Sequence, residues 1–279
     1  MKKPYGKELE DSNPRLEMPW YNRLDVVSVT FLIFILLVIS SVGALKGSGR
    51  DLDHWENLQR FIGKWFPPDP SVLDPVMEAM LETFQIAVMA TFFAIGISLV
   101  LSMGAANNLA PKWLVGLTRM TLNVIRTIPS LLWALVAVSL VGAEPLAGVI
   151  ALTFYSIGYL GKFFSESFES SEMKITKSLR GIGAKPFQAF QYGLWPQVKP
   201  QIWSHSLWML EYNVRSASII GYVGAGGVGT NLQIYVDSNS WDKVSMVLIC
   251  ILAVVTFLDL VGESIRLRIK SRTGRREQS

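Results

Sequence analysis

The sequence predicts an all-helical, polytopic membrane protein with about six transmembrane helices. Half of its residues are hydrophobic, only 17% are charged, and the mean hydropathy is +0.33. Soluble domains carry about 25% charged residues. Apolar runs close to the roughly 20 residues that cross a bilayer recur along the chain. Because open sheet edges are not tolerated in hydrocarbon, we expect these runs to be helices.

Six apolar segments are the candidate spans. They lie at residues 26–45, 80–104, 113–142, 145–164, 201–222 and 244–262. The first segment has two interpretations, a cleaved signal peptide or a retained helix. Its near-spanning length and its long polar lead favour the retained helix. In the third segment, Pro129 is expected to break or kink the helix, because proline lacks an N–H and clashes with the preceding turn.

The distribution of Lys and Arg predicts the topology, since cytoplasmic loops are rich in basic residues. Three regions are basic: the N-terminal tail, the link between the fourth and fifth segments, and the C-terminal tail. The links after the third and fifth segments, "VGAEPLAG" and "VGAGGVGTNLQIYVDSNSWD", contain no Lys or Arg. We therefore expect both termini in the cytoplasm. The loop at 46–76 then lies outside, where "WENLQRFIGKWF" is expected to form an interfacial helix. A net charge of +4 is explained by topology rather than by nucleic-acid binding.

The basic link contains the pattern of two short helices joined by a turn. Ile175, Leu179 and Ile182 recur at helical spacing. Gly183 permits a turn that other residues resist, and Pro186 suits the first position of a second helix. The apolar face of that second helix comprises Phe187, Phe190 and Leu194. From the pattern alone, the segment is either a hairpin on the membrane surface or a docking element for a cytoplasmic partner.

This segment resembles the cytoplasmic coupling loop of ABC importer permeases. That family pattern is Glu-Ala-Ala, three residues, Gly, nine residues, Ile, one residue, Leu-Pro, and Gly183 and Pro196 stand at the matching separation. The Glu-Ala-Ala positions hold Lys177, Ser178 and Leu179, the Ile position holds Gly193, and the Leu position holds Trp195. The resemblance implies ATPase coupling through Lys177, Ser178, Leu179, Gly183, Ala184, Pro186 and Pro196. The missing acidic residue weakens the expectation of a salt bridge from that position.

Two other stretches, residues 126–167 and 211–233, resemble phosphonate-type ABC permeases. The resemblance implies a type I ABC importer architecture, a homodimer of permeases, two cytoplasmic ATPase subunits that bind ATP and Mg, and an external solute-binding protein. The expected organisation of the chain is a cytoplasmic N-terminal tail at 1–25, a first helix and external loop at 26–78, a permease core at 79–265 with a cytoplasmic coupling loop at 169–200, and a basic cytoplasmic tail at 266–279. The expected solute is a phosphonate or a related oxyanion such as phosphite. Another small solute, such as methionine or a sulfonate, and a channel or ion-driven carrier are the alternatives.

Polar residues inside the predicted spans are candidates for a substrate path, because burying them costs energy. Glu211 and Arg215 are four residues apart and can pair on one helical face. Arg215 then either forms a structural pair with Glu211 or contacts the solute, and Arg126 is either an interfacial anchor or a ligand for an anion. The full candidate set is Arg126, Glu211, Asn213, Arg215, Ser216 and Ser218.

The stretch "GYVGAGGVG" at 221–229 contains five glycines: Gly221, Gly224, Gly226, Gly227 and Gly229. It lacks the Lys-Ser/Thr ending of a P-loop, so nucleotide binding is not expected. Close helix packing through small residues and a bent outer gate are the two interpretations. The lone Cys250, and His54 and His205 in separate regions, offer no catalytic or metal-ligand spacing. We therefore expect no cofactor on this chain and no enzymatic activity of its own.

Overall fold

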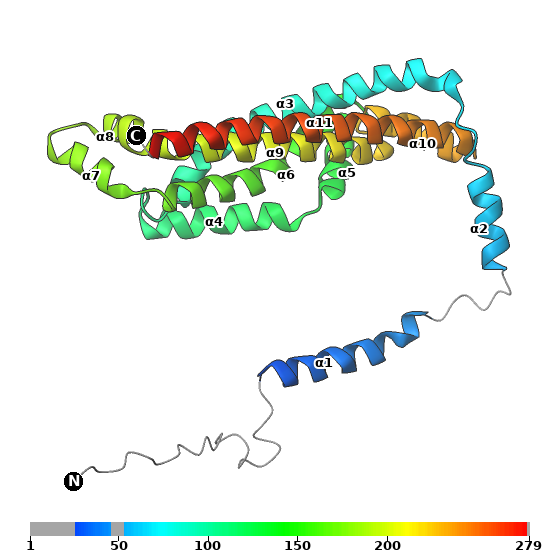
Figure 1. Ribbon diagram of the computed structural model, residues 1–279, viewed down its shortest axis with the longest axis horizontal. Helices are drawn as coiled ribbons and strands as arrows, with labels where there is room; N and C mark the ends of the chain where they lie inside the picture. Colours follow the sequence, from blue (N-terminus) through cyan, green and yellow to red (C-terminus); the bar gives the residue numbers. More distant parts are fainter. Residues whose placement is uncertain (1–25, 46–52, 278–279) are drawn as a thin grey trace, which may run out of the picture. The chain divides into compact units, whose positions relative to one another are not determined.

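The computed structural model describes residues 26–45 and 53–277, and all regular secondary structure in these ranges is helical. This confirms the predicted all-helical class (Figure 1). The predicted N-terminal tail at 1–25 lies outside the described residues. The elements are α1 (Val26–Ser41), η2 (Val42–Leu45), α2 (His54–Gly63), η3 (Pro70–Val72), α3 (Leu73–Ala105), α4 (Lys112–Thr127), α5 (Ser130–Val141), α6 (Pro145–Glu169), α7 (Met173–Gly181), α8 (Pro186–Ala189), η4 (Phe190–Leu194), α9 (Trp195–Ile220), η5 (Gly221–Val223), α10 (Val228–Asp237) and α11 (Trp241–Glu277).

The chain divides into two units, residues 1–59 and 60–279. The first contains α1, whose apolar window Val27–Ala44 is long enough to cross a membrane and buries no side chain within the protein. A helix that is apolar on all faces needs an apolar environment. The predicted span at 26–45 therefore has the length and composition of a transmembrane helix.

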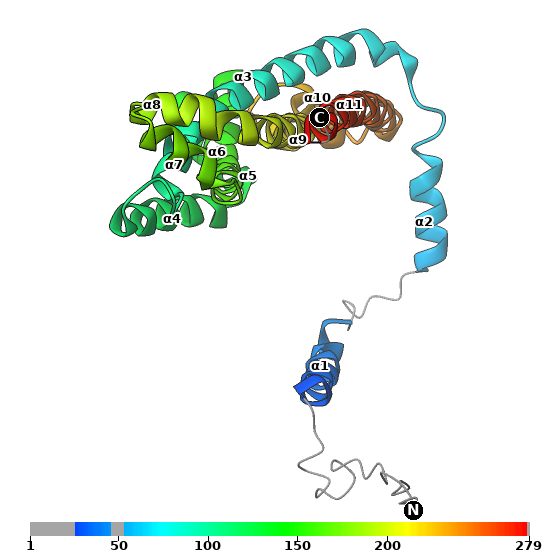
Figure 2. The same cartoon turned by 60° about the vertical axis from the view of Figure 1, so that its left-hand side comes forward.

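Three helices, α3, α6 and α9, form the centre of the second unit and pack on one another (Figures 1 and 2). The buried face of α3 is made of small residues at helical spacing, which include Ala87, Ala90, Thr91, Ala94 and Ser98. Small side chains let helix backbones approach closely, the packing mode that lipid favours because no hydrophobic effect drives helices together there. Larger side chains, such as Phe164, Phe168 and Met209, fill the core toward α7.

The predicted third span at 113–142 is not one helix. It is broken into α4 and α5, which are bent by 88°. Between them, Ile128 is extended (φ −89°, ψ 118°) and Pro129 precedes the first residue of α5. The residue before a proline is sterically excluded from the helical region, so the expected break at Pro129 is confirmed.

Within the residues that the structure describes, four unbroken helices are apolar and long enough to cross a membrane, and the bent pair α4–α5 is a fifth candidate. Of the six predicted spans, the one at 201–222 does not meet this hydropathy criterion. The corresponding helix, α9, has 26 residues, about 39 Å at 1.5 Å per residue, and so exceeds a hydrocarbon core of about 30 Å. Its polar residues lower its hydropathy, and several of them, such as Glu211 and Asn213, contact neighbouring helices, as described below.

The helix α11 extends beyond its predicted span of 244–262 at both ends. It runs without a break from Trp241 to Glu277, so the expected boundary of a basic tail at residue 266 falls inside a helix. At its start, Trp241 contacts Phe61 and stacks on Trp65, with ring centroids 4.9 and 5.9 Å apart. The predicted helix in "WENLQRFIGKWF" is confirmed as α2.

The segment between α2 and α3 is also held by backbone and capping contacts. The Asp69 N–H donates to the Asp242 carbonyl over 3.3 Å. Asp69 also caps η3 by accepting a hydrogen bond from the Ser71 N–H. Hydrogen bonding from the Ser71 side chain and backbone lowers the pKa of the Asp69 carboxyl. The cap therefore persists at neutral pH, where this carboxyl is ionised.

Candidate functional site

The segment from α7 to η4 is a helix, a turn and a second short helix, as the sequence predicts. Gly183 adopts a positive φ of 95°, and the Ala184 N–H donates to the Leu179 carbonyl over 3.1 Å. Pro186 occupies the first turn of α8, where its missing N–H has no cost. The second helix is shorter than expected, because after one turn it widens into the π-helical η4 and continues directly into α9.

Large apolar side chains are exposed at the tip of this segment. Ile182 and Phe187 are 83% and 73% exposed. The expected stripe is split, since Leu179 is half-buried and faces inward to Gly193. Exposed apolar side chains beside basic ones are typical of a docking surface. Of the predicted coupling residues, Lys177, Ser178, Gly183, Pro186 and Pro196 are exposed, and Ala184 is half-buried.

The departure from the family pattern at Gly193 has a packing reason. A Cβ built there would lie 2.9 Å from the Thr176 Oγ1 and 3.0 Å from the Thr176 Cα. The isoleucine of the family pattern has no room at this position. The glycine lets α7 lie directly against η4.

Gln197 fixes the geometry of this segment and was not predicted from the sequence. Its Oε1 accepts from the Glu172 N–H over 3.0 Å, and its Nε2 donates to the Glu172 and Gly193 carbonyls over 3.2 and 2.6 Å. One amide thereby joins the start of α7, the π-helical turn and the first turn of α9. Nothing in the spacing of the sequence indicated this role.

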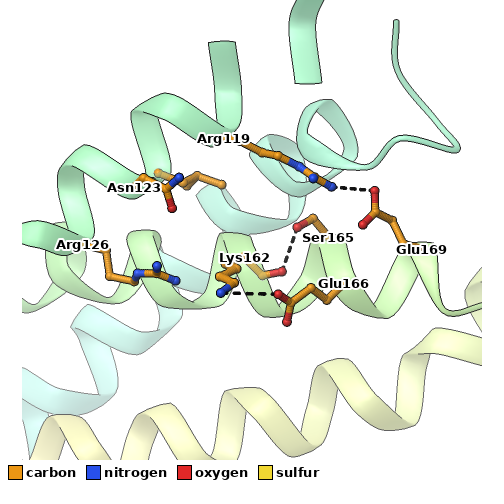
Figure 3. Close-up of a pocket in the computed structure, with 8 residues that line it drawn as sticks. Arg119, Asn123, Arg126, Lys162, Ser165, Glu166 and Glu169 are labelled. Carbon is orange, nitrogen blue, oxygen red and sulfur yellow. Dashed lines mark hydrogen bonds and ion pairs between the residues drawn. The ribbon is translucent and has the colours of Figure 1, made fainter. Parts of the chain in front are cut away.

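A cavity of about 370 Å³ lies between α4 and α6 (Figure 3). Figure 1 shows that α7 follows the end of α6. The polar lining of the cavity consists of three cations, two carboxylates, an amide and a hydroxyl: Arg119, Arg126, Lys162, Glu166, Glu169, Asn123 and Ser165. Of these, only Arg126 was predicted as a substrate-path residue. The helices approach closely because α6 has Gly158 against Arg126 and Gly161 against Leu122.

The charged side chains of the cavity are paired unequally. The Arg119 Nη2 lies 2.6 Å from the Glu169 Oε1, and its Nε donates to the Ala105 carbonyl over 2.9 Å. The Lys162 Nζ lies 3.5 Å from the Glu166 Oε1. The Arg126 guanidinium lies over the Tyr159 ring, 5.6 Å from its centroid. Arrangements of Arg and Lys side chains suit a small oxyanion.

The predicted pair between Glu211 and Arg215 does not form. Glu211 pairs with Arg266, and Arg215 pairs with Asp259 over 3.0 Å. The two helices are antiparallel neighbours, so α11 presents a partner of opposite charge at each level. Glu211 and Arg215 therefore each pair with a residue of α11 rather than with each other, because the paired side chains point toward each other across the helix contact.

The other predicted path residues on α9 are buried among helices and do not line the cavity. Asn213 is fully buried; its Nδ2 donates to the hydroxyls of Thr91 and Ser156, each over 2.9 Å. Ser216 and Ser218 are also buried, and the Ser218 hydroxyl donates to the Val214 carbonyl over 3.2 Å. This polar network joins α3, α6 and α9 and satisfies groups that are costly to bury unpaired.

The glycine-rich stretch interrupts the helix, as expected. Gly224, Gly226 and Gly227 have positive φ values of 90°, 79° and 73°, and α10 begins at the next residue. The Val228 N–H donates to the Thr83 hydroxyl of α3 over 2.8 Å. Gly221 and Gly229 face each other so closely that a Cβ on either would strike backbone atoms. The close-packing interpretation therefore applies to these two positions, while the gate remains a prediction.

Within residues 26–45 and 53–277, no group of three or more His, Cys, Asp or Glu side chains comes together as a metal site would require. His205 lies on α9 and stacks against Phe163, with ring centroids 5.0 Å apart. Cys250 is buried in α11. The arrangement therefore has two features with chemical consequences: a cavity with a charged lining and a hydrogen-bonded link from α7 to α9.

This helical arrangement is that of the type I ABC importer permeases. An inward-facing structure of the MetNI methionine ABC transporter superposes with a TM-score of 0.64 at 19% identity, covering 72% of this chain and 99% of that one. Residues 96–271 match the family described as the binding-protein-dependent transport system inner membrane component, and the chain belongs to this family. It is a multi-pass membrane protein and an ABC importer permease, of the phosphonate-type group.

Relatives of this chain from Stutzerimonas stutzeri include two that match it over most of its length. The phosphite transport system permease protein PtxC is 33% identical over 90% of this chain and 91% of its own length. The putative phosphite transport system permease protein HtxC is 36% identical over 75% of this chain and 74% of its own length.

Proposed function

We propose that the protein is the permease subunit of an ATP-driven importer for phosphite or a related phosphonate. The observation that carries the substrate class is the similarity to a phosphite permease over 90% of the chain. The cation-lined cavity supports it, because Arg126 and Lys162 offer charge to a small phosphorus oxyanion.

In this proposal the permease itself carries out no ATP chemistry. Two cytoplasmic ATPase subunits, with ATP and Mg, dock on the segment from α7 to η4, where Ile182 and Phe187 are exposed. Gln197 connects that segment to α9, so movement of the docked subunit reaches the spanning helices as a rigid-body displacement. The permease pairs with a second copy, and both termini are cytoplasmic. The location is the plasma membrane of a prokaryote, which is the inner membrane in a cell with two membranes.

At the opposite end of the bundle, an external solute-binding protein delivers the solute. The glycine-rich break at 221–229 lies at that end, between α9 and α10 (Figure 1). Gly224, Gly226 and Gly227 have positive φ values there, and backbone that departs from a helix at membrane depth has to line protein or water. This stretch is the outer gate of the proposal.

The test is uptake into proteoliposomes that contain the permease with its ATPase and binding protein. Radiolabelled phosphite should enter only with ATP, and unlabelled methylphosphonate should compete with it more strongly than methionine or an alkyl sulfonate. Preferred uptake of methionine or a sulfonate would show that the proposed substrate class is wrong. Uptake that persists without the ATPase would show that the protein is a channel or an ion-driven carrier rather than part of an ATP-driven importer.

A further inference from the structure

Three cations face the cavity between α4 and α6, and they differ in how firmly they are held. Arg119 is committed to the protein, because it donates to both the Glu169 carboxylate and the Ala105 carbonyl. Through these two hydrogen bonds, Arg119 of α4 connects the end of α3 with the end of α6. Its charge is balanced by Glu169, so neither residue is available to a solute.

Arg126 is held in place without being neutralised. Its guanidinium lies over the Tyr159 ring at 5.6 Å, and its backbone is close to Gly158 of α6. In the described part of the chain, no carboxylate forms an ion pair with it. An aromatic face orients a cation and leaves its N–H groups able to bind an anion.

Lys162 has a partner that it can exchange. Its distance of 3.5 Å from Glu166 is longer than a charge-assisted hydrogen bond, and the two side chains are 44% and 56% exposed. Exposed ion pairs of this kind on one helix stabilise a protein only slightly. An incoming anion can therefore displace the Glu166 carboxylate from Lys162.

We propose that Arg126 and Lys162 form a transient binding site for a small oxyanion, and that Glu166 returns to Lys162 when the anion leaves. The site rests on the proposed function for its natural ligand, a phosphite-like anion. Figure 3 shows both cationic side chains extending into the space between α4 and α6. The cavity is many times the roughly 30 Å³ that one water occupies in the liquid, so the anion keeps part of its hydration.

The local charge explains why the site binds weakly, as a transport path requires. After Arg119 and Glu169 neutralise each other, Arg126 and Lys162 stand against Glu166. The remaining single positive charge attracts an anion, and the nearby carboxylate opposes long residence. Tight binding would slow release, whereas a counter-ion that stays within reach lowers the barrier to leaving.

The experiment uses a reporter in the wall of the cavity. Asn123 is exposed and lines the cavity, so Asn123→Cys in a Cys250→Ser background can be labelled by an anionic methanethiosulfonate in the purified protein. Sodium phosphite at about two to four times a millimolar dissociation constant should slow labelling about threefold to fivefold relative to sodium chloride of equal ionic strength, because the protection factor for one site is one plus the ratio of the ligand concentration to the dissociation constant. Arg126→Gln or Lys162→Gln should remove the protection. Lys112→Gln, on the same helix but outside the cavity, should keep it.

Glu166→Gln provides a second measurement that does not depend on losing binding. Phosphite protection should increase in this variant, and it should stay unchanged in Glu263→Gln, an exposed carboxylate on α11. Equal protection by chloride, or protection that persists in Arg126→Gln, would overturn the site. Protection by phosphite without phosphite uptake would uphold the oxyanion site and reject the substrate proposed above. Phosphite uptake without protection would uphold the proposed substrate and reject the oxyanion site.

Discussion

The Glu211 carboxylate on α9 accepts a hydrogen bond from the Arg266 guanidinium on α11, although Arg215 lies one helical turn away on the same helix. Arg215 instead meets Asp259, the residue seven positions before Arg266. Two ion pairs thereby join the antiparallel helices α9 and α11, and α9 supplies the carboxylate of one pair and the cation of the other. The pairs differ in environment: the Glu211 and Arg266 side chains are 11% and 24% exposed, and those of Arg215 and Asp259 are 52% and 45% exposed.

Removing Arg266 should destabilise the protein more than removing Arg215. Arg266→Gln leaves the nearly buried Glu211 carboxylate unpaired, and breaking a fully buried pair costs about 3 to 5 kcal/mol. Because Arg266 is partly exposed, we expect about 2 to 3 kcal/mol, whereas Arg215→Gln should cost about 1 kcal/mol or less. Thermal unfolding in detergent measures both.

The double variant Glu211→Gln with Arg266→Gln should recover most of the stability lost in Arg266→Gln, since no charge is then left unpaired. A larger loss from Arg215→Gln than from Arg266→Gln would contradict this ranking of the two pairs.

A methyl group at Gly262 should displace the Glu211 carboxylate from Arg266. An added Cβ would collide with the Glu211 carboxylate, which has to pass this point to reach Arg266. We expect Gly262→Ala to lower the unfolding temperature in the same way as Arg266→Gln. Gly96→Ala on α3 is the control, because nothing lies within 4 Å of its added Cβ and alanine is the better helix former by about 1 kcal/mol. Equal behaviour of the two variants would show that the close contact is relieved without cost.

The helical class, the approximate positions of the long helices and the break at Pro129 could be predicted from the sequence, because hydropathy and proline act over a few neighbouring residues. The 88° bend between α4 and α5 could not, since its size depends on how α5 packs against α6. The continuation of α11 past residue 266 was missed for a related reason. A basic composition identifies the region as polar and does not say where its helix ends.

The candidate site was predicted less completely, because its residues come together from distant parts of the chain. Helical spacing suggested Arg215 as the partner of Glu211, since only i+4 neighbours are visible in one segment. The true partner follows 55 positions later. Lys162 and Arg126 share a cavity only because Gly158 and Gly161 bring α6 against α4. Had these two glycines been interpreted as a close helix contact, the charged residues beside them would have been candidates.

Gln197→Ala should uncouple ATP hydrolysis from transport. The variant loses three hydrogen bonds that join α7, η4 and α9, each worth about 1 kcal/mol. In proteoliposomes with the partner subunits, we expect fewer solute molecules imported per ATP hydrolysed, with normal insertion. The control is Gln201→Ala, which alters an exposed glutamine one turn later on α9. An unchanged ratio of transport to hydrolysis in Gln197→Ala would mean that the amide has no part in coupling.

Gly183→Asp should weaken docking of the ATPase. A side chain at φ 95° is strained by about 1 to 2 kcal/mol, although no atom lies within 4 Å of an added Cβ. The turn between α7 and α8 should therefore change shape without a steric clash. Gly181→Asp adds the same charge at a helical glycine that also has open space around it. Co-purification of the ATPase measures docking. Equal retention of the ATPase by both variants would favour the alternative that the segment is a membrane-surface hairpin.

Single cysteines at Ser171 and Ser238 should be labelled from opposite sides of the membrane in a Cys250→Ser background. Ser171 lies between α6 and α7, and Ser238 follows α10, at the other end of the bundle (Figure 1). Between the two positions α9 is the only long helix of the described chain, and it is the one whose hydropathy alone does not mark it as a span. Its charged residues Glu211 and Arg215 are paired with α11, so it can cross without exposing unpaired charge to lipid. A membrane-impermeant maleimide applied to right-side-out and inverted vesicles measures the side of each cysteine. Labelling of both from one side would show that α9 does not cross, and the proposed cytoplasmic position of α7 predicts that Ser171→Cys reacts only in inverted vesicles.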